Sequence, residues 1–187
     1  MNRKTLLFII AVLAGVALSA HANLVVNPGF ETGSFAPWTN TGDTSFSGVG
    51  SGAPFAHSGN FGAYFGPTSG DGFLDQNITT VAGQSYIVDF WLSNDDQLAN
   101  NHMSASFNGV QILSLNSSPP FPYTHYTSNP IMATTALTDL HFTFYNPPAY
   151  WYLDDVAVNV VPEPGTLGLI ALGGLGLVGA VRKRFLV

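Results

Sequence analysis

Basic residues and cysteine are almost absent from the greater part of this 187-residue chain. There is no cysteine, and the five lysines and arginines all lie near the two ends, at Arg3, Lys4, Arg182, Lys183 and Arg184. Residues 23–161 hold ten acidic side chains and no lysine or arginine, which gives a formal charge of −10. Such a segment cannot neutralise phosphates, which excludes nucleic acid as a partner, and it cannot bind anionic groups through arginine. Without disulfides, its stability must come from a core that a domain of about 140 residues can supply.

Helical periodicity is also scarce between residues 23 and 161. Short alternating runs separated by Gly, Pro, Asn and Ser are typical of an all-β protein. We expect strands at 85–93, 140–146 and 151–160, and a hairpin at 103–113 that turns at Asn108-Gly109. No period of twenty to fifty residues repeats, so these strands are expected to form one domain.

The first 22 residues have the features of a signal peptide. The start MNRK is basic, residues 6–18 are apolar, and Ala20-His21-Ala22 has the small residues of a cleavage site. An uncleaved anchor is the alternative, but the apolar run is shorter than the ~20 residues of a spanning helix. The mature chain is therefore expected to begin at Asn23.

A second apolar segment, residues 167–181, lies near the end of the chain. It covers only ~22 Å as a helix, so it is a marginal transmembrane span. A buried helix of a globular protein would show a polar face, and this segment shows none. The basic cluster Arg182, Lys183 and Arg184 would stay on the cytoplasmic side, which places the folded part outside.

Several stretches resemble a known fold. NLVVNPGFETGSFAPWT (23–39) and YWYLDDVAV (150–158) resemble the first and last strands of galactose-binding-like jelly-roll domains, the fold of many carbohydrate-binding modules. GAYFG, ITTVAGQSYIVDFWLSND and FNGVQIL in between are similar to the same group. The resemblance implies a single jelly-roll β-sandwich over residues 23–161, between an N-terminal signal peptide and a C-terminal transmembrane helix.

The C-terminal residues 162–187 resemble a PEP-CTERM sorting signal. The motif Pro162-Glu163-Pro164 is followed by the apolar Gly-rich segment and by the basic cluster, in the order found in that family. The resemblance implies that an exosortase recognises the motif and removes the helix, after which the protein reaches the cell surface or an extracellular polysaccharide matrix. A plain membrane anchor is the alternative.

A metal site is expected where the ends of the domain meet. Glu31 follows the first expected strand, and Asp154 and Asp155 lie in the last one, which neighbours the first in a jelly roll. Calcium prefers carboxylate and carbonyl oxygens. The resemblance implies a structural Ca²⁺ held by Glu31 and Asp154. The alternative is that Asp154 and Asp155 only accept hydrogen bonds from loop amides.

A carbohydrate-binding surface is the second expected site. Trp91 and Tyr145 lie on the sides of their strands opposite the expected core residues, with Asp89 and His141 beside them. Packing of Trp91 within the protein is the alternative, since most aromatic side chains are buried.

Enzyme activity is not expected. The acidic pairs 71/75 and 95/96 are too close in sequence for a glycosidase, the histidines lack metal-ligand spacing, and G-x-S-x-G is absent. The expected function is a structural or adhesive role at the cell surface with weak glycan binding. The alternatives are a secreted glycan-active enzyme and a surface protein without a ligand.

Overall fold

A computed structural model describes residues 22–96, 98 and 100–162 of the chain. The predicted transmembrane helix, the basic cluster, Glu163 and Pro164 of the sorting motif, and Ala20 of the cleavage site lie outside the described residues. Ala22 and Pro162 are the first and last described residues, and both are exposed.

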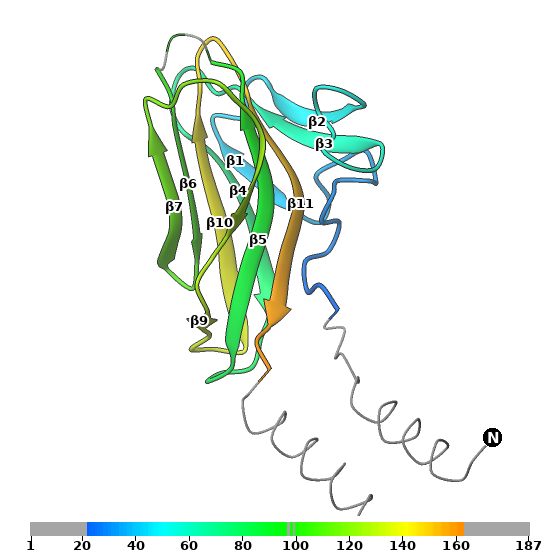
Figure 1. Cartoon of the computed structure of the whole chain (residues 1–187), viewed down its shortest axis with the longest axis vertical. Helices are drawn as coiled ribbons and strands as arrows, with labels where there is room; N and C mark the ends of the chain where they lie inside the picture. Colours follow the sequence, from blue (N-terminus) through cyan, green and yellow to red (C-terminus); the bar gives the residue numbers. More distant parts are fainter. Residues whose placement is uncertain (1–21, 97, 99, 163–187) are drawn as a thin grey trace, which may run out of the picture. The chain divides into compact units, whose positions relative to one another are not determined.

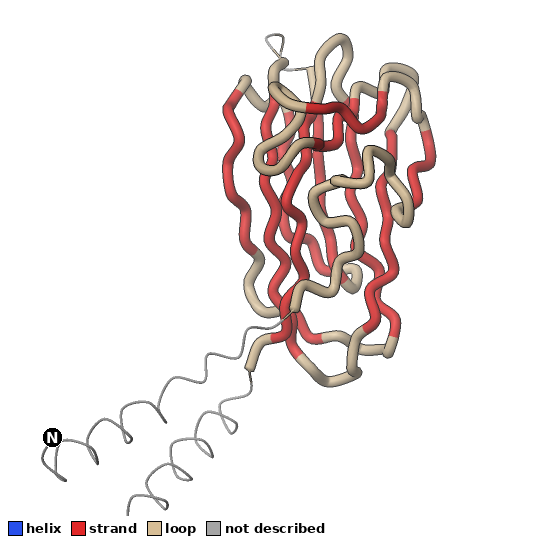
Figure 2. Tube along the Cα trace, turned by 90° about the vertical axis from the view of Figure 1, so that its right-hand side faces the viewer, coloured by secondary structure: helices blue, strands red, loops and turns tan. Residues whose placement is uncertain are grey.

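The described residues form a β-sandwich of two antiparallel sheets (Figure 1, Figure 2). The first, sheet A, contains in spatial order β1 (Thr39–Gly42), β4 (Gly72–Thr79), β10 (Leu137–Tyr145), β6 (His102–Phe107) and β7 (Val110–Asn116). The second, sheet B, contains β2 (Ser47–Ser51), β3 (Phe61–Phe65), β11 (Trp151–Val160), β5 (Ser85–Asn94) and β8 (Phe121–Thr127). The short β9 (Ile131–Met132) also pairs with β5. No helix occurs among the described residues, and the predicted all-β sandwich is confirmed.

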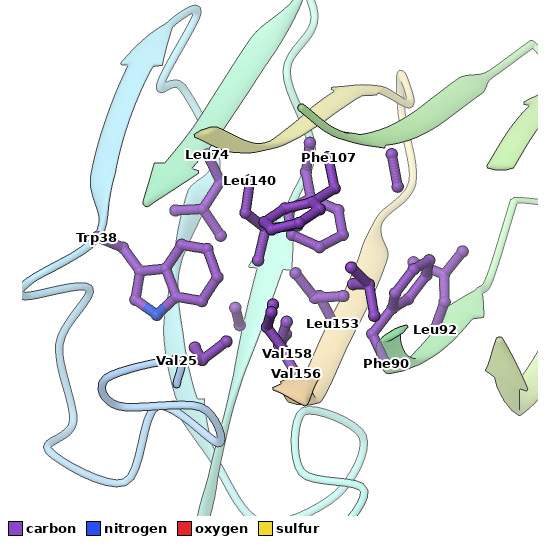
Figure 3. Close-up of a cluster of buried hydrophobic side chains, with 14 of the residues drawn as sticks. Val25, Trp38, Leu74, Phe90, Leu92, Phe107, Leu140, Leu153, Val156 and Val158 are labelled. Carbon is purple, nitrogen blue, oxygen red and sulfur yellow. The ribbon is translucent and has the colours of Figure 1, made fainter. Parts of the chain in front are cut away.

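Alternation along the strands produces the core between the two sheets. In β5 the side chains of Tyr86, Val88, Phe90 and Leu92 are at most 1% exposed, and the side chains between them lie on the outer face. This is the pattern that a strand with one buried face must have. Trp38, Leu74, Phe107, Leu140 and Leu153 surround the same core (Figure 3).

Aromatic contacts join the two sheets. The rings of Phe65 in β3 and Phe144 in β10 stack with centroids 4.0 Å apart and an interplanar angle of 2°. Phe90 in β5 meets Phe142 in β10 edge to face at 5.3 Å. Aromatic side chains therefore contribute a large part of the apolar area buried between sheets A and B.

The predicted strands and hairpin are confirmed. β11 covers residues 151–160, and β6 and β7 meet at Asn108-Gly109, where both residues have positive φ (53° and 71°). Such φ values belong to a type I′ turn, which an Asn-Gly pair favours.

The resemblance predicts a first strand within residues 23–39, ahead of Glu31, and this prediction is wrong for residues 23–38. This segment carries no strand, although Leu24 N–H donates to Val158 O at 3.0 Å and so lies beside β11. Its other bonds come from side chains: Asn23 Oδ1 accepts from the amides of Val25 and Val158, and Gln76 Oε1 accepts from the amide of Val26. Side-chain amides here take the place of the regular ladder that a first strand would form with β11.

The β-sandwich is a self-contained unit. Residues 22–161 form one compact unit, and the whole buried core lies between residues 25 and 158. Because the core and both sheets use only residues of this unit, we expect the fragment 23–161 to fold without either terminal segment.

Candidate functional site

The three carboxylates of the predicted metal site converge on one loop. Asp154 Oδ2 accepts hydrogen bonds from the amides of His57 and Ser58 at 2.7 and 3.1 Å. Glu31 accepts from the amides of Asn60 and Phe61. Asp155 is bonded through its two oxygens to Ser58 Oγ and His57 Nδ1, each at 2.7 Å. The segments that contain these acids are remote in sequence, and the structure brings all three to this loop, although ligand atoms of the three acids do not all lie within 4.8 Å of one another.

Asp154 is the most unusual of the three acids. Its side chain is fully buried, and burial raises its pKa to about 6, although the amides of Ser58, Asp155 and His57 counteract the rise. It lies at an irregularity in the pairing of β11 with β5, and the next residue, Asp155, has a φ of 49°. The bulge turns both carboxylates towards the 57–61 loop.

The fit of this group to a cation is partial. Asp154 Oδ1 accepts one hydrogen bond, from the amide of Asp155, and therefore keeps a free lone pair. No lysine or arginine exists in residues 23–161 to neutralise a buried carboxylate. Both oxygens of Asp155, however, are occupied by His57 and Ser58. Glu31 is no less engaged, because its Oε1 accepts from the amides of Asn60 and Phe61 and its Oε2 accepts from that of Asn60. An oxygen with one hydrogen bond keeps a lone pair, so Asp154 Oδ1 and Glu31 Oε2 can take a Ca²⁺ ion that draws its other ligands from loop carbonyls, and hydrogen bonding alone does not set Asp155 apart from them.

The predicted carbohydrate-binding residues of sheet B lie under a loop. His57, in the 52–60 loop, stacks on the Trp91 indole with ring centroids 3.7 Å apart and an interplanar angle of 14°. His125 of β8 stacks on the same indole at 5.2 Å. Asp89 bonds to Thr127 Oγ1 and lies 3.3 Å from His125 Nε2. Contacts within the protein therefore occupy Trp91 and Asp89.

The other two predicted residues lie on the outer face of sheet A. There, the Tyr145 and His102 rings stack across β10 and β6 at 5.1 Å with an interplanar angle of 16°. A second ring pair, Phe73 and His141, lies on the adjoining strands β4 and β10 at 5.6 Å and 30°. Thr143 pairs with Phe73 across the sheet and lies between the two ring pairs along β10. All five side chains are partly exposed.

Carboxylates flank both ring pairs. Asp71 Oδ1 bonds to His102 Nε2 at 2.8 Å, and Asp75 Oδ1 bonds to His141 Nδ1 at 2.5 Å. Asp75, Asp139 and His141 each offer one atom that could bind a metal, and these three atoms lie within 4.8 Å of one another. In the described part of the chain, no other three His, Cys, Asp or Glu side chains come this close. Desolvation and the neighbouring Asp75 raise the pKa of Asp139. His141 Nε2 forms a further hydrogen bond with Thr143 Oγ1 at 3.0 Å, so hydrogen bonds between side chains already hold this cluster together.

The four predicted carbohydrate-binding residues therefore do not form one surface. Trp91 and Asp89 belong to sheet B, whereas Tyr145 and His141 belong to sheet A, on the opposite side of the sandwich. Alternation along a strand shows which side chains leave the core, but it does not show which sheet the strand joins. Phe73 and His102, which complete the two ring pairs, were not predicted from the sequence. Phe73 could have been found, because it alternates with the buried Leu74 in β4.

The tail and the fold each match known proteins. Residues 160–184 match the model of the PEP-CTERM protein-sorting motif. No curated protein matches the chain in sequence. The described part of the chain contains no helix that is long and apolar enough to cross a membrane.

Solved structures with the same fold are mainly carbohydrate-binding modules. A family 61 module in complex with β-1,4-galactotriose is 22% identical, with a TM-score of 0.64 over 75% of this chain and 99% of that one. A xylan-binding domain of family 22 from Paenibacillus barcinonensis is 12% identical, with a TM-score of 0.53 over 79% and 99%. The K1 cleaved adhesin domain of Lys-gingipain from Porphyromonas gingivalis W83 is 14% identical, with a TM-score of 0.53 over 72% and 96%. At these identities the likeness shows the fold alone, a jelly-roll β-sandwich of the carbohydrate-binding-module type.

Proposed function

We propose that this PEP-CTERM-bearing jelly-roll protein is exported, held at the membrane by its C-terminal segment, processed there by an exosortase, and binds neutral glycans at the cell surface or in its matrix. The sorting motif at 160–184 supports export and processing. The fold supports glycan binding, because relatives of the same architecture are named for the glycans that they bind. The proposal includes a structural or adhesive role, which the likeness of the fold to an adhesin domain supports.

The observation that carries glycan binding is the pair of ring stacks on the outer face of sheet A. Ring faces in the Tyr145–His102 and Phe73–His141 pairs offer apolar surface that suits the C–H faces of sugar rings. The hydroxyl of Thr143 and the carboxylate of Asp75 lie beside them as hydrogen-bonding groups for sugar hydroxyls. The ring pairs lie on three adjacent strands, so one oligosaccharide can cross both.

Charge selects the class of glycan. Residues 23–161 carry ten carboxylates and no lysine or arginine, so a uronic-acid polymer would be repelled and would find no cationic partner. Neutral polysaccharides such as galactan or xylan carry no such penalty. The proposal is therefore restricted to neutral glycans.

The proposal includes a structural calcium ion between Glu31 and Asp154. Their carboxylates hold the 57–61 loop, and this loop carries His57 onto Trp91. An ion at this position would neutralise the buried Asp154 and order the loop. It would act on stability and would not contact the glycan on sheet A.

Isothermal titration calorimetry on the fragment 23–161 tests the glycan proposal. Titrations with β-1,4-galactan and xylan oligosaccharides are expected to give heat of binding, whereas polygalacturonate oligosaccharides are not. Tyr145→Ala should weaken binding by about tenfold, which corresponds to ~1.4 kcal/mol of lost ring contact. His125→Ala is the matched control, because His125 also stacks on an aromatic ring beside an aspartate, but on sheet B. Equal losses in both variants, or no heat with any neutral glycan, would refute the proposal.

A further inference from the structure

The C-terminal end of the sandwich is the end where β11 finishes (Figure 1). Val161 N–H donates to Ser85 O, and Gln84 Nε2 donates to Val161 O, each at 2.8 Å. These bonds tie the last residue of the domain to the turn between β4 and β5. The end of the domain from which the tail departs is therefore fixed by hydrogen bonds.

Two more segments belong to this end of the sandwich. Residues 131–137 are bonded to the β4–β5 turn, because Gly83 N–H donates to Ala133 O and Thr80 N–H donates to Ala136 O. The β6–β7 turn joins them, since Asn108 Nδ2 donates to Met132 O at 2.9 Å. Three turns and the exit of the tail thus form one connected surface.

This surface carries several exposed apolar side chains among small polar ones. Four of the seven exposed large hydrophobic side chains of the described residues lie here, and we call them the apolar end: Val81, Val110, Met132 and Leu137, which are 67%, 48%, 56% and 57% exposed. Exposed apolar side chains that gather at one place commonly mark a contact surface, whereas scattered ones need no explanation.

The same surface lacks charge. None of residues 79–88, 106–112, 130–138 and 156–161 is acidic or basic, in a domain with a formal charge of −10. The exposed Asp139, two residues along β10 from Leu137, borders this surface, because its backbone carbonyl accepts from the amide of Asn108 at 3.1 Å. Turns at the end of a sandwich are ordinarily rich in polar and charged residues, so this composition is unusual.

The length of chain beyond the domain indicates what meets this surface. Only five residues separate Val161 from Leu167, where the apolar segment of the sorting signal begins. Even a fully extended chain covers at most about 20 Å over this interval. A tail inserted in the membrane therefore keeps the apolar end within reach of the lipid surface. Because anionic headgroups repel the rest of the domain, this is also the end that can approach them.

We propose that the apolar end docks on the lipid surface while the C-terminal segment tethers the protein to the membrane. This contact keeps the apolar end facing the membrane, with the Pro-Glu-Pro motif at the level of the headgroups. The inference rests on the proposed membrane tether, but it does not depend on glycan binding. Partial insertion of Val81, Met132 and Leu137 would supply the contact, as apolar side chains do in interfacial proteins. Docking ends when the tail is removed, which releases the domain from the membrane.

Tethered vesicles test this inference. The fragment 23–161 with a C-terminal His-tag is attached to phosphatidylcholine vesicles that contain a nickel-chelating lipid, so the tether does not depend on the native tail. The chain has no cysteine, so Met132→Cys can be labelled alone with an environment-sensitive NBD dye. Ser69→Cys is the matched control, because this exposed residue adjoins the other end of β4.

The expected result is a blue shift and protection from aqueous dithionite at position 132 on vesicles, and no change at position 69. Val81→Ser with Leu137→Ser should abolish the shift at position 132 while circular dichroism stays that of the folded domain. Equal responses at both positions, or none, would overturn the inference. A shift at position 132 that grows with protein concentration without vesicles would also overturn it, because the partner would then be a second copy of the chain. Galactan binding by the free fragment is measured separately, so failure of one proposal is distinguishable from failure of the other.

Discussion

The buried carboxylate of Asp154 leads to a sharp prediction about pH. Its pKa is raised from 3.8 to about 6 by burial, so folding favours the protonated form. A raised acid pKa contributes stability that is fully present below the unfolded pKa and is lost as pH rises through the folded one. The metal-free domain should therefore be less stable at pH 7 than at pH 4 on account of this residue.

The difference between the two pKa values sets the magnitude. A gap of about two units changes the free energy of unfolding by ~3 kcal/mol between full protonation and full ionisation of Asp154. About 2 kcal/mol of this change falls between pH 4 and pH 7. For a domain of this size, that loss lowers Tm by roughly 8 °C. Asp154→Asn cannot titrate, so the stability of the wild type relative to this variant should fall by ~2 kcal/mol over the same interval.

Urea unfolding of the fragment 23–161 in the presence of a chelator is the assay. Comparison with Asp154→Asn at each pH cancels the titration of the groups that do not interact with Asp154. Parallel profiles of the two proteins between pH 4 and pH 7 would refute the burial argument. Millimolar calcium should raise the Tm of the wild type at pH 7 and flatten its pH profile, because a bound cation holds the carboxylate ionised. A profile unchanged by calcium or chelator would remove the ion from the site.

Three further predictions concern strain, packing and processing. Gly59 has a φ of 64°, and a Cβ there would collide with the Glu31 carboxylate, whereas Gly52 has a φ of 65° and an empty surrounding. In urea unfolding, both alanine variants should lose ~1 kcal/mol of stability to backbone strain. Gly59→Ala should lose more than Gly52→Ala, because its Cβ displaces the Glu31 carboxylate. Equal losses would contradict the role of Glu31 in holding the loop. Phe144→Ala should cost ~3–5 kcal/mol, whereas Phe46→Ala, at a side chain 63% exposed, should cost under ~0.5 kcal/mol in the same assay. Because trypsin has no site in residues 23–161, mass spectrometry of the extracted protein should show one large fragment that ends at the Pro-Glu-Pro motif; a fragment that continues to the basic cluster would show that the tail is retained.

Alternation predicted the strands well where a strand has one buried and one outer face. β5 up to Leu92, β6 and β10 show this pattern, and their core residues could be read directly from the sequence, whereas the first four residues of β11 are all buried. The first strand was expected from the fold resemblance of residues 23–39, and the segment 23–38 forms none. Its Leu24 and Val25 are apolar neighbours, but its hydrogen bonds go to Asn and Gln side chains, and alternation carries no information about such bonds.

The candidate site was predictable only in part, because its geometry depends on contacts between distant segments. Glu31 and Asp154 could be placed together, since the fold resemblance brings the first segment beside the last strand. The covering of the Trp91 ring depends on His57, whose loop has no strand pattern of its own. Tyr145 was correctly placed on an outer face, but its partner His102 lies 43 positions earlier, and only the pairing of β10 with β6 brings them into contact.

The absence of lysine and arginine explains how the carboxylates of the domain are used. Each histidine of residues 23–161 is within bonding distance of an aspartate, and these four pairs join β8 to β5, β10 to β4, and two loops to strands. Other acids accept backbone amides instead: Asp43 takes those of Ser45, Thr68 and Ser69, and the bonds with Ser45 and Ser69 hold its pKa well below the usual range. Carboxylates that accept amides fasten loops to the sandwich without a cationic side chain. A domain stabilised in this way can place its negative charge on its faces and far end and leave the end beside the tail uncharged, as contact with a lipid surface requires.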